Sequence, residues 1–296
     1  MNADQVYDVL CIGNYTKDTI VSPMGVRYVD GGAVNYAAHA AARLGLKTAV
    51  VTRLAQEHAR VVEKLTQAGI DCRAIYAPES TCMKLEYPTN DPDVRHLSVT
   101  STAGSITVNE VKNLKAKAVV IGTSLRGEVG LDVIEAMDEK DTLLAADAQG
   151  FVRVLRGQRL EYEPWGEMNA TLAHLDILKA DAVEAEFLTG ESDIREAAVA
   201  FARMGRAEIV LTHKDGLLVL AEGQFHAARF YPRNLDGRSG RGDTCIGAYV
   251  AMRLTKPPAE AGIWAAAVTS LKMETLGPFN RSIKEVEDLI HDRYDA

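Results

Sequence analysis

The sequence predicts an α/β fold, a doubly wound, mostly parallel sheet flanked by helices, with a small β lid. Three observations support this class. Short apolar runs rich in β-branched residues recur along the chain, as expected of strands that are buried on both faces. Helical patterns lie between these runs, and several of them end at glycine. Two stretches of short strand-like pieces without helical periodicity interrupt this alternation.

The alternation of strands and helices can be followed along the chain. The first apolar run, residues 6–13, is short and closed by glycine, and similar runs follow at residues 48–52, 118–122, 142–147, 176–179 and 208–212. Helical patterns occupy residues 34–44, 58–68, 128–138 and 194–204, and three of these stop at Gly45, Gly69 and Gly205. After Asp243 the chain is helical almost to its end, with breaks at Pro257 and Pro278. This order favours a parallel sheet with helices on both faces.

Two segments predict the lid. Residues 19–30 and 71–102 carry strand-like pieces at 26–29, 83–87 and 96–99, separated by Pro, Asn and Asp. A prior of roughly 150 residues per domain gives two folding units or one large domain with an appendage. The sequence has no internal repeat and no low-complexity linker. We therefore expect a single domain over residues 1–296, with the two lid segments inserted in it.

Composition narrows the functional classes. The net charge of −8 gives no global attraction to phosphate backbones or anionic lipid, so nucleic acid and membrane surfaces are poor candidate partners. The chain lacks an apolar run of the roughly 18 residues that span a bilayer, and its start does not resemble a signal peptide. We expect a cytoplasmic protein. The four cysteines show no CxxC pair or zinc spacing, which predicts reduced thiols.

The strongest local signal is the segment Gly240-Arg241-Gly242-Asp243, which precedes an apolar helical run. Glycines let backbone N–H groups turn towards an anion, and a helix start adds unpaired donors and the positive end of its dipole. Asp243 would lie beside this phosphate cradle, where it could take a proton from an attacking hydroxyl. The alternative is an ordinary helix start, in which glycine makes the turn and the aspartate satisfies the dipole.

A second glycine pair, Gly31-Gly32, precedes the alanine-rich helical pattern that contains Asn35. Without side chains, this pair would let a ligand approach the backbone at a helix start, and Asn35 could bond a hydroxyl. The alternative is tight packing of the alanine-rich helix.

Taken together and in order, these segments resemble the PfkB carbohydrate kinase family, which has the ribokinase-like fold. Residues 9–18 resemble its first strand and the substrate aspartate that follows. The segment from Gly31-Gly32 to Gly45 resembles its first signature, Asp181-Ala182-Val183-Glu184 its NxxE element, and residues 240–243 its GAGD motif. Four elements in the family's order, across most of the chain, are far more specific than any one of them.

The resemblance implies an ATP-dependent kinase that phosphorylates a hydroxyl of a small polyol, either a sugar, an inositol-like cyclitol or a nucleoside. ATP and Mg²⁺ are the implied cofactors, and a monovalent cation is a further candidate. The lid would close over the acceptor, and its exposed apolar side chains suggest a homodimer. The implied roles are general base for Asp243; anion hole for Gly240, Arg241 and Gly242; substrate binding for Asp18, Gly31, Gly32 and Asn35; ATP binding for Asp181, Glu184, Thr212, Lys214 and Gly216; and Mg²⁺ binding through water for Glu184 and Asp181.

Four departures from the family pattern stand out. The family's substrate Asn falls on Tyr36, the Asn of NxxE is Asp181, and the ATP loop retains only one glycine, Gly216. The Ala of GAGD is Arg241, for which two interpretations stay open. Its guanidinium could clamp the transferring phosphate, or it could point to solvent or pair with an acidic neighbour. Tyr36 and the segments 147–153 and 270–273 resemble an inositol-kinase-like branch more than ribokinase itself.

Two other functional classes remain as alternatives. One is a non-catalytic ligand-sensing protein on the same fold, against which the retained Asp243 argues. The other is a Rossmann-type dinucleotide enzyme. The first strand is followed by residues 13–18 without a GxGxxG pattern, which makes that interpretation the weaker of the two.

Overall fold

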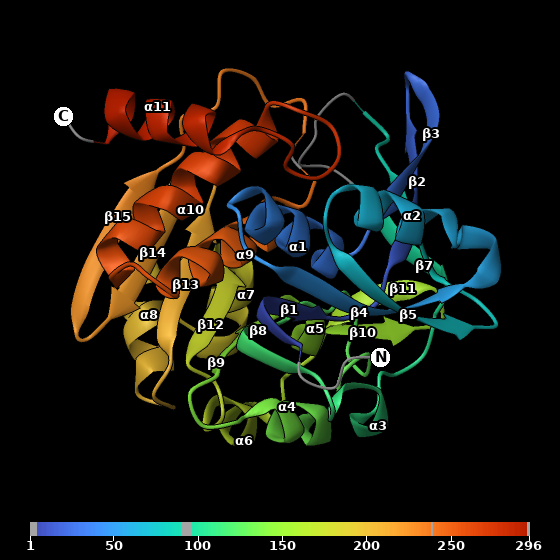
Figure 1. The fold of residues 1–296 in the computed structure, drawn as a ribbon, viewed down its shortest axis with the longest axis horizontal. Helices are drawn as coiled ribbons and strands as arrows, with labels where there is room; N and C mark the ends of the chain where they lie inside the picture. The colour runs from blue at the N-terminus through green and yellow to red at the C-terminus, as the bar shows by residue number, and fades with distance from the viewer. Residues whose placement is uncertain (1–4, 90–95, 238, 295–296) are drawn as a thin grey trace.

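The computed structural model describes residues 5–89, 96–237 and 239–294 and is built around a nine-stranded sheet (Figure 1). The strand order is β15-β14-β13-β12-β9-β8-β1-β4-β5, and every neighbouring pair from β13 to β5 is parallel. All six strands predicted from the apolar runs are confirmed. The strands are β1 (Val6–Ile12), β4 (Thr48–Ala55), β5 (Asp71–Ala77), β8 (Lys115–Ile121), β9 (Leu143–Asp147), β12 (Ile177–Asp181), β13 (Glu208–His213), β14 (Gly216–Ala221) and β15 (Gln224–Arg229), the last two joining in antiparallel fashion.

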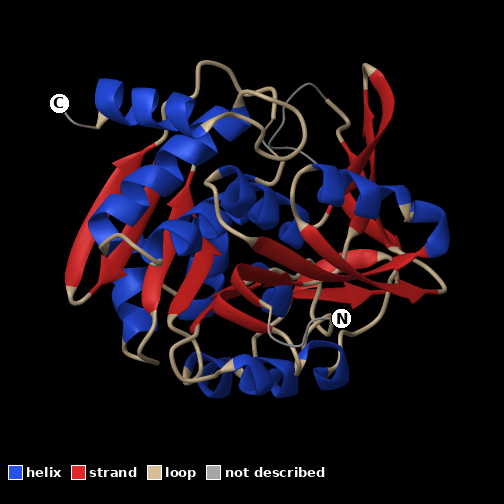
Figure 2. Cartoon of the chain, in the orientation of Figure 1, coloured by secondary structure: helices blue, strands red, loops and turns tan. Residues whose placement is uncertain are grey.

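Helices cover both faces of this sheet, as Figure 2 shows. Alternate side chains of β1 enter different cores: Val9 and Cys11 pack on one face, and Leu10 and Ile12 on the other. One core is built by α1 (Ala33–Arg43), α9 (Arg241–Arg253) and α10 (Pro258–Met273), with α11 (Ile283–Arg293) packed against α10. The other is built by α4 (Leu131–Met137), α6 (Met168–Leu172), α7 (Ala182–Thr189) and α8 (Ile194–Ala202), near the short α3 (Val108–Val111).

Two predicted helices begin later in the structure than expected. The pattern at 58–68 becomes a 3₁₀ turn, Gln56–His58, followed by α2 (Arg60–Gln67). The pattern at 128–138 becomes α4, which begins only after Gly130, because Val129 pairs with Ile106 in an isolated parallel bridge and the Glu128 carboxylate accepts from the Ser124 N–H. Apolar periodicity could not distinguish this extended entry from a first helical turn.

A second sheet of six strands forms the lid, in the order β10-β11-β7-β6-β2-β3. Its apolar face contains Ile20, Met83, Leu85 and Val99, which pack with Leu125. We call this sheet the lid sheet. Its strands are β2 (Thr16–Ser22), β3 (Gly25–Gly31), β6 (Thr81–Glu86), β7 (His96–Ser101), β10 (Arg153–Arg156) and β11 (Arg159–Tyr162).

The lid boundaries differ from the sequence-based expectation in two places. Residues 71–77, assigned to the lid, form β5 at the edge of the main sheet, because β4, α2 and β5 make a parallel crossover unit that returns the chain beside β4. Residues 153–162 join the lid as the hairpin β10–β11, which turns at Gly157 with φ 63°. The predicted lid segment 71–102 includes residues 90–95, which lie outside the described residues.

Within residues 5–89, 96–237 and 239–294, no helix is long and apolar enough to cross a membrane. Cys11, Cys72, Cys82 and Cys245 are free thiols, as predicted.

The two glycine motifs meet because α1 and α9 pack closely. A Cβ atom on Gly247 would lie 2.5 Å from the Cα of Ala37, so only glycine permits this separation. The two helices begin at Ala33 and Arg241, and residues from both starts line one cavity at the carboxyl ends of the central strands. Open α/β sheets bind ligands at this edge.

Candidate active site

A cavity of about 320 Å³ lies between the strand ends and the lid sheet. The starts of α1 and α9 contribute Gly32, Ala33 and the whole segment 240–243 to its wall. The lid covers it with Met83 and Leu85 of β6 and with neighbouring apolar side chains. The lid also contributes the polar residues Thr16 and Asp18 of β2 and Arg153 of β10, so polar groups reach the cavity from both sheets.

The start of α9 is built to receive an anion. Gly240 adopts left-handed φ and ψ of 77° and 15°, and a Cβ there would lie 2.3 Å from the ring of Tyr36. No side chain of the described residues caps this 13-residue helix, which leaves the N–H groups of its first turn for a ligand. Gly242 matters for a different reason, since a Cβ there would lie 2.6 Å from the Lys179 ammonium. The absence of a side chain lets that cation approach the helix start.

Asp243 lines the cavity one position further along α9. Burial raises the pKa of its carboxyl, and the negative Glu184 raises it further, whereas the cations Lys179 and Arg153 oppose the shift. A carboxylate with a raised pKa is a better proton acceptor than an exposed one. This environment suits a general base.

Asp18, on β2, is a second carboxylate in the same cavity, and it is buried. Burial raises its pKa to about 6, and the charge of Asp243 adds to the increase. Its Oδ1 atom has no hydrogen-bond partner among the described residues, and Gly31 makes room beside its Oδ2, where a Cβ would approach to 2.4 Å. Asp18 thus presents an acceptor to a ligand hydroxyl.

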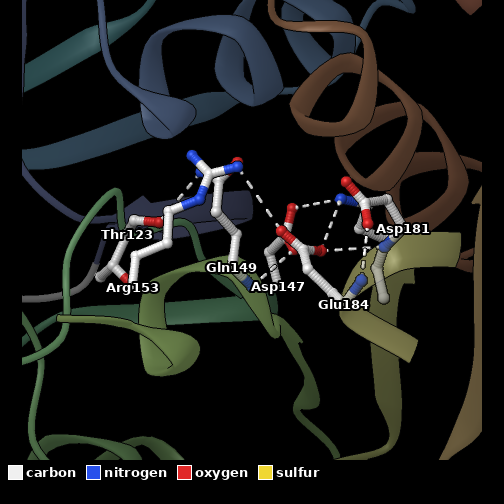
Figure 3. A network of polar contacts seen from close by, with 7 residues as sticks. Thr123, Asp147, Gln149, Arg153, Asp181 and Glu184 are labelled. Carbon is white, nitrogen blue, oxygen red and sulfur yellow. Dashed lines mark hydrogen bonds and ion pairs between the residues drawn. The ribbon is translucent and has the colours of Figure 1, made fainter. Parts of the chain in front are cut away.

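A buried charge network connects the main sheet to the lid (Figure 3). The Lys179 ammonium of β12 lies 2.8 Å from Asp147 Oδ2 and 4.0 Å from Glu184 Oε2. Arg153, at the start of lid strand β10, lies 3.6 Å from Glu184 Oε1. Burial lowers the pKa of Lys179, but the surrounding carboxylates raise it above its ordinary value, so the ammonium stays charged. Lys179 and Arg153 both line the cavity, as does Arg241.

Asp181 and Glu184 form a reciprocal cap at the start of α7. The Asp181 Oδ1 atom accepts from the Glu184 N–H at 2.8 Å, and Glu184 Oε2 accepts from the Asp181 N–H at 2.9 Å. Their spacing of three residues is that of a capping box, rather than of two positions within one helix. Asp181 lines the cavity, while Glu184 lies fully buried behind it, where burial raises its pKa to about 7.

Only some of the other residues predicted from the sequence line the cavity. Gly32 and Thr212 line the cavity, and the Thr212 hydroxyl is buried without a partner among the described residues. Asn35 donates to the Asp30 carbonyl at 3.1 Å and lines a neighbouring cavity instead. Lys214 lies in the exposed turn after β13, Gly216 begins β14, and neither lines the cavity.

The sequence analysis did not identify the cations Lys179 and Arg153, or the carboxylate Asp147, as site residues. Asp147 and Lys179 are charged residues within apolar strands, and that pattern could have marked both as site residues. Arg153 had no such signal, because its role depends on the lid hairpin that begins with it. Gln149 and Ser124 also line the cavity and follow strands β9 and β8.

The fold and this cavity define a class: an α/β enzyme that binds a hydroxyl compound under a lid, next to a helix start suited to a phosphoryl group. The family model of the pfkB family carbohydrate kinases matches residues 4–284. The chain therefore belongs to this family, and it is a phosphotransferase with an alcohol group as acceptor. None of the curated proteins searched matches it.

Solved structures show the same fold. A pyrophosphate-dependent kinase in the ribokinase family, solved as a sulfate complex, is 34% identical, with a TM-score of 0.88 over 94% of this chain and 99% of that one. A myo-inositol-1 kinase, also pyrophosphate-dependent and converted by mutation into a myo-inositol-3 kinase, is 33% identical, with a TM-score of 0.87 over 97% and 99%. Ribokinase of Arabidopsis thaliana, complexed with ribose and ATP, is 18% identical, with a TM-score of 0.78 over 97% and 99%.

Proposed function

We propose that the protein phosphorylates a hydroxyl of an inositol-like cyclitol, with Asp243 as the general base. The observation that carries this proposal is the pairing of Asp18, which is buried, with Asp243, which is half-buried; both line one cavity beside the start of α9, which no side chain of the described residues caps. One of them binds an acceptor hydroxyl, and the other takes the proton of the hydroxyl that attacks. The similarity to inositol kinases at 33% identity supports the cyclitol over other polyols.

The residues around Asp243 provide for the charge of the phosphoryl group. The first-turn N–H groups of α9 and the cations Lys179, Arg153 and Arg241 converge on the same cavity. Charge that develops on the phosphoryl oxygens is stabilised by such fixed donors and cations. Met83 and Leu85 of the lid keep water away from the reacting atoms.

The phosphate donor is a separate part of the proposal. The family resemblance predicts ATP. Two features instead favour inorganic pyrophosphate. The cavity of about 320 Å³ is at the small end of the range for ligand sites and is rich in cations, while Lys214 and Gly216 of the expected ATP loop lie outside it. The relatives at 33% and 34% identity are pyrophosphate-dependent. We therefore infer pyrophosphate as the donor.

The residues present fit a Mg²⁺ ion. Asp181 offers a carboxylate in the cavity wall, and Glu184 behind it has an Oε1 atom that forms an ion pair with Arg153 at 3.6 Å but accepts no hydrogen bond from the described residues. Acidic oxygens of this kind hold Mg²⁺ through its water shell. When bound, the ion neutralises charge on the donor phosphates. Asp181 and Glu184 would hold it, and their mutual capping would keep the two carboxylates in place.

A two-way activity screen tests the proposal. Pyrophosphate and ATP are each combined with myo-inositol, ribose and a nucleoside in the presence of Mg²⁺, and product phosphate esters are measured. We expect the highest kcat/KM for myo-inositol with pyrophosphate. A Lys214→Ala variant serves as the control, because its exposed side chain should not affect a pyrophosphate-dependent rate.

Each other outcome has a clear meaning. A rate with ATP that falls in Lys214→Ala would overturn the donor assignment and restore the sequence-based expectation. Preference for ribose or a nucleoside would overturn the cyclitol assignment. Ligand binding without turnover for any combination would favour the ligand-sensing alternative.

A further inference from the structure

We propose that Lys272 is a positioning residue, an internal cation that holds the backbone before α9 so that the anion site and Asp243 are correctly placed. The inference rests on the proposed function for its kinetic consequences, but its structural part stands on the contacts of one side chain. Lys272 is the second-last residue of α10 and lies in the segment 270–273, to which the sequence assigns no catalytic or binding role.

The contacts of Lys272 are with the segment that leads into α9. The residue is fully buried, and its ammonium donates to the carbonyl oxygens of Gly237 and Ser239. The Gly237 N–H in turn donates to the Met273 carbonyl at 2.8 Å. A Cβ on Gly237 would lie 1.7 Å from the Thr275 carbonyl oxygen, so the chain passes directly against the end of α10. The end of α10 therefore fixes the backbone just before Gly240.

Tyr36 completes the arrangement from the other side. Its ring lies under the Lys272 ammonium, 5.1 Å from Nζ to the ring centroid, and also packs against Gly240. Its hydroxyl forms a hydrogen bond with Ser239. Lys272 and Tyr36 therefore contact Gly237, Ser239 and Gly240, the backbone that sets the direction of the first turn of α9. This arrangement gives Tyr36, which replaces the family's substrate Asn, a packing role.

The energetics argue against an ordinary core position. A buried ammonium loses its hydration, and burial lowers the pKa of Lys272 to about 8 even though the nearby Asp243 opposes the shift. Among the described residues the contacts of its ammonium are two carbonyl oxygens and an aromatic face, and no ion pair with a carboxylate is among them. An apolar side chain would fill this space at lower cost. A cation here is explained by what it does for the neighbouring site.

The test uses the intact protein with pyrophosphate and myo-inositol. In Lys272→Ala we expect kcat to fall by at least about 10²-fold, the scale of a misplaced catalytic group, while KM for myo-inositol changes less than about threefold because Asp18 is untouched. Methylammonium or ethylammonium should enter the vacated space and raise the kcat of this variant at least about tenfold. Tetramethylammonium, which cannot donate a hydrogen bond, should not. Lys284→Ala, on an exposed lysine of α11, is the matched control.

Lys272→Met separates positioning from folding. Its side chain fills the space without charge, so the variant should keep the melting temperature of the wild type or exceed it, lose kcat, and show no alkylammonium rescue. A folded Lys272→Met protein with more than half of the wild-type kcat would overturn the inference. So would a folded Lys272→Ala protein with reduced kcat on which alkylammonium ions have no effect.

A second readout keeps this inference distinct from the proposed function. If the wild type turns over no donor, the proposed function fails, and the affinity for pyrophosphate alone is then measured by calorimetry. We expect Lys272→Ala and Lys272→Met to bind pyrophosphate at least about tenfold more weakly, with faster hydrogen exchange at the amides of residues 240–243. Unchanged affinity and exchange would overturn the positioning role whatever the reaction is.

Discussion

The carboxylate of Asp18 lowers the stability of the fold at the pH at which it is ionised. Asp18 is 9% exposed, and its pKa is raised from 3.8 to about 6, so the folded protein holds this proton more tightly than the unfolded chain does. The free energy of unfolding therefore falls as the pH rises through that interval, and ionised Asp18 destabilises the fold above pH 6. A shift of about two units corresponds to about 3 kcal/mol at most.

Asp18→Asn tests this cost. The variant should be more stable than the wild type at pH 7.5, by on the order of 1–3 kcal/mol, and the gain should shrink at pH 4.5, where the native Asp18 is protonated. Activity should fall, because the amide cannot replace the carboxylate as a hydroxyl acceptor. Denaturant titrations at the two pH values provide the measurement. An equal stability difference at both would show that Asp18 carries no such cost.

Arg241 allows a second prediction at this scale. It lines the cavity in the first turn of α9, which favours the phosphate-clamp interpretation left open by the sequence. If its guanidinium meets the phosphoryl group mainly in the transition state, Arg241→Ala should lower kcat more than it raises KM for the donor. Arg241→Lys should recover only part of the rate. Steady-state kinetics at varied pyrophosphate concentration test this prediction. Equal kcat values for the wild type and Arg241→Ala would contradict the phosphate-clamp role of Arg241.

Individual residues were predictable where local sequence dictates their role. Gly240 and Asp243 follow from the physics of a helix start, and the structure places both at the cavity. Lys179 stands out only as a charge within an apolar strand, and Arg153 has no local signal; the role of each depends on a neighbour 32 or 31 residues away, Asp147 or Glu184. A pattern along the chain does not encode a contact between distant strands.

At the scale of elements, the lid sheet is joined to the main sheet by the charge network. Arg153 begins β10 and reaches Glu184, which caps α7. Ligands that engage these cations should therefore also order the lid strands. We expect slower hydrogen exchange in β2, β6 and β10 when myo-inositol and a non-hydrolysable pyrophosphate analogue are bound together. No added protection would contradict lid closure, and the β14–β15 hairpin serves as an internal control.

The lid also shows which elements a sequence can reveal. Residues 26–29, 83–87 and 96–99 were predicted as strands from their composition and flanking turn residues, and all lie in lid strands except Tyr87, which follows the end of β6. The hairpin at 153–162 was missed because its arms are four residues long and rich in charge. β5 was misplaced because half-buried edge strands of either sheet have the same composition, and only the crossover from β4 through α2 assigns it.

At the scale of the whole molecule, the class of fold followed from the alternation of apolar runs with helical patterns, since all six apolar runs are strands of the central sheet. The order of the strands in the sheet could not be predicted from these runs. The sequence contains no rule that places β8 and β4 on either side of β1; packing of helices on both faces decides this.

The outer edge of the lid predicts a dimer. β3 is an edge strand of the lid sheet, and it exposes Val26 and Tyr28, next to the almost fully exposed Met24. Unpaired strand edges with apolar side chains favour association with a second copy. We expect a homodimer by sedimentation and a monomer for Val26→Lys/Tyr28→Lys. A wild-type monomer at concentrations up to about 100 times those of the assay would rule this interface out.

The central claim is that Asp243 accepts the proton of the attacking hydroxyl, and single-turnover kinetics of Asp243→Asn test it most directly. With enzyme in excess over pyrophosphate and saturating myo-inositol, we predict a rate of phosphoester formation about 10²–10⁴-fold below that of the wild type, the range for a lost general base. Pyrophosphate affinity, measured by calorimetry, should stay within about threefold, because the first-turn N–H groups and the cations remain. A variant that retains more than about a tenth of the wild-type single-turnover rate would contradict the account.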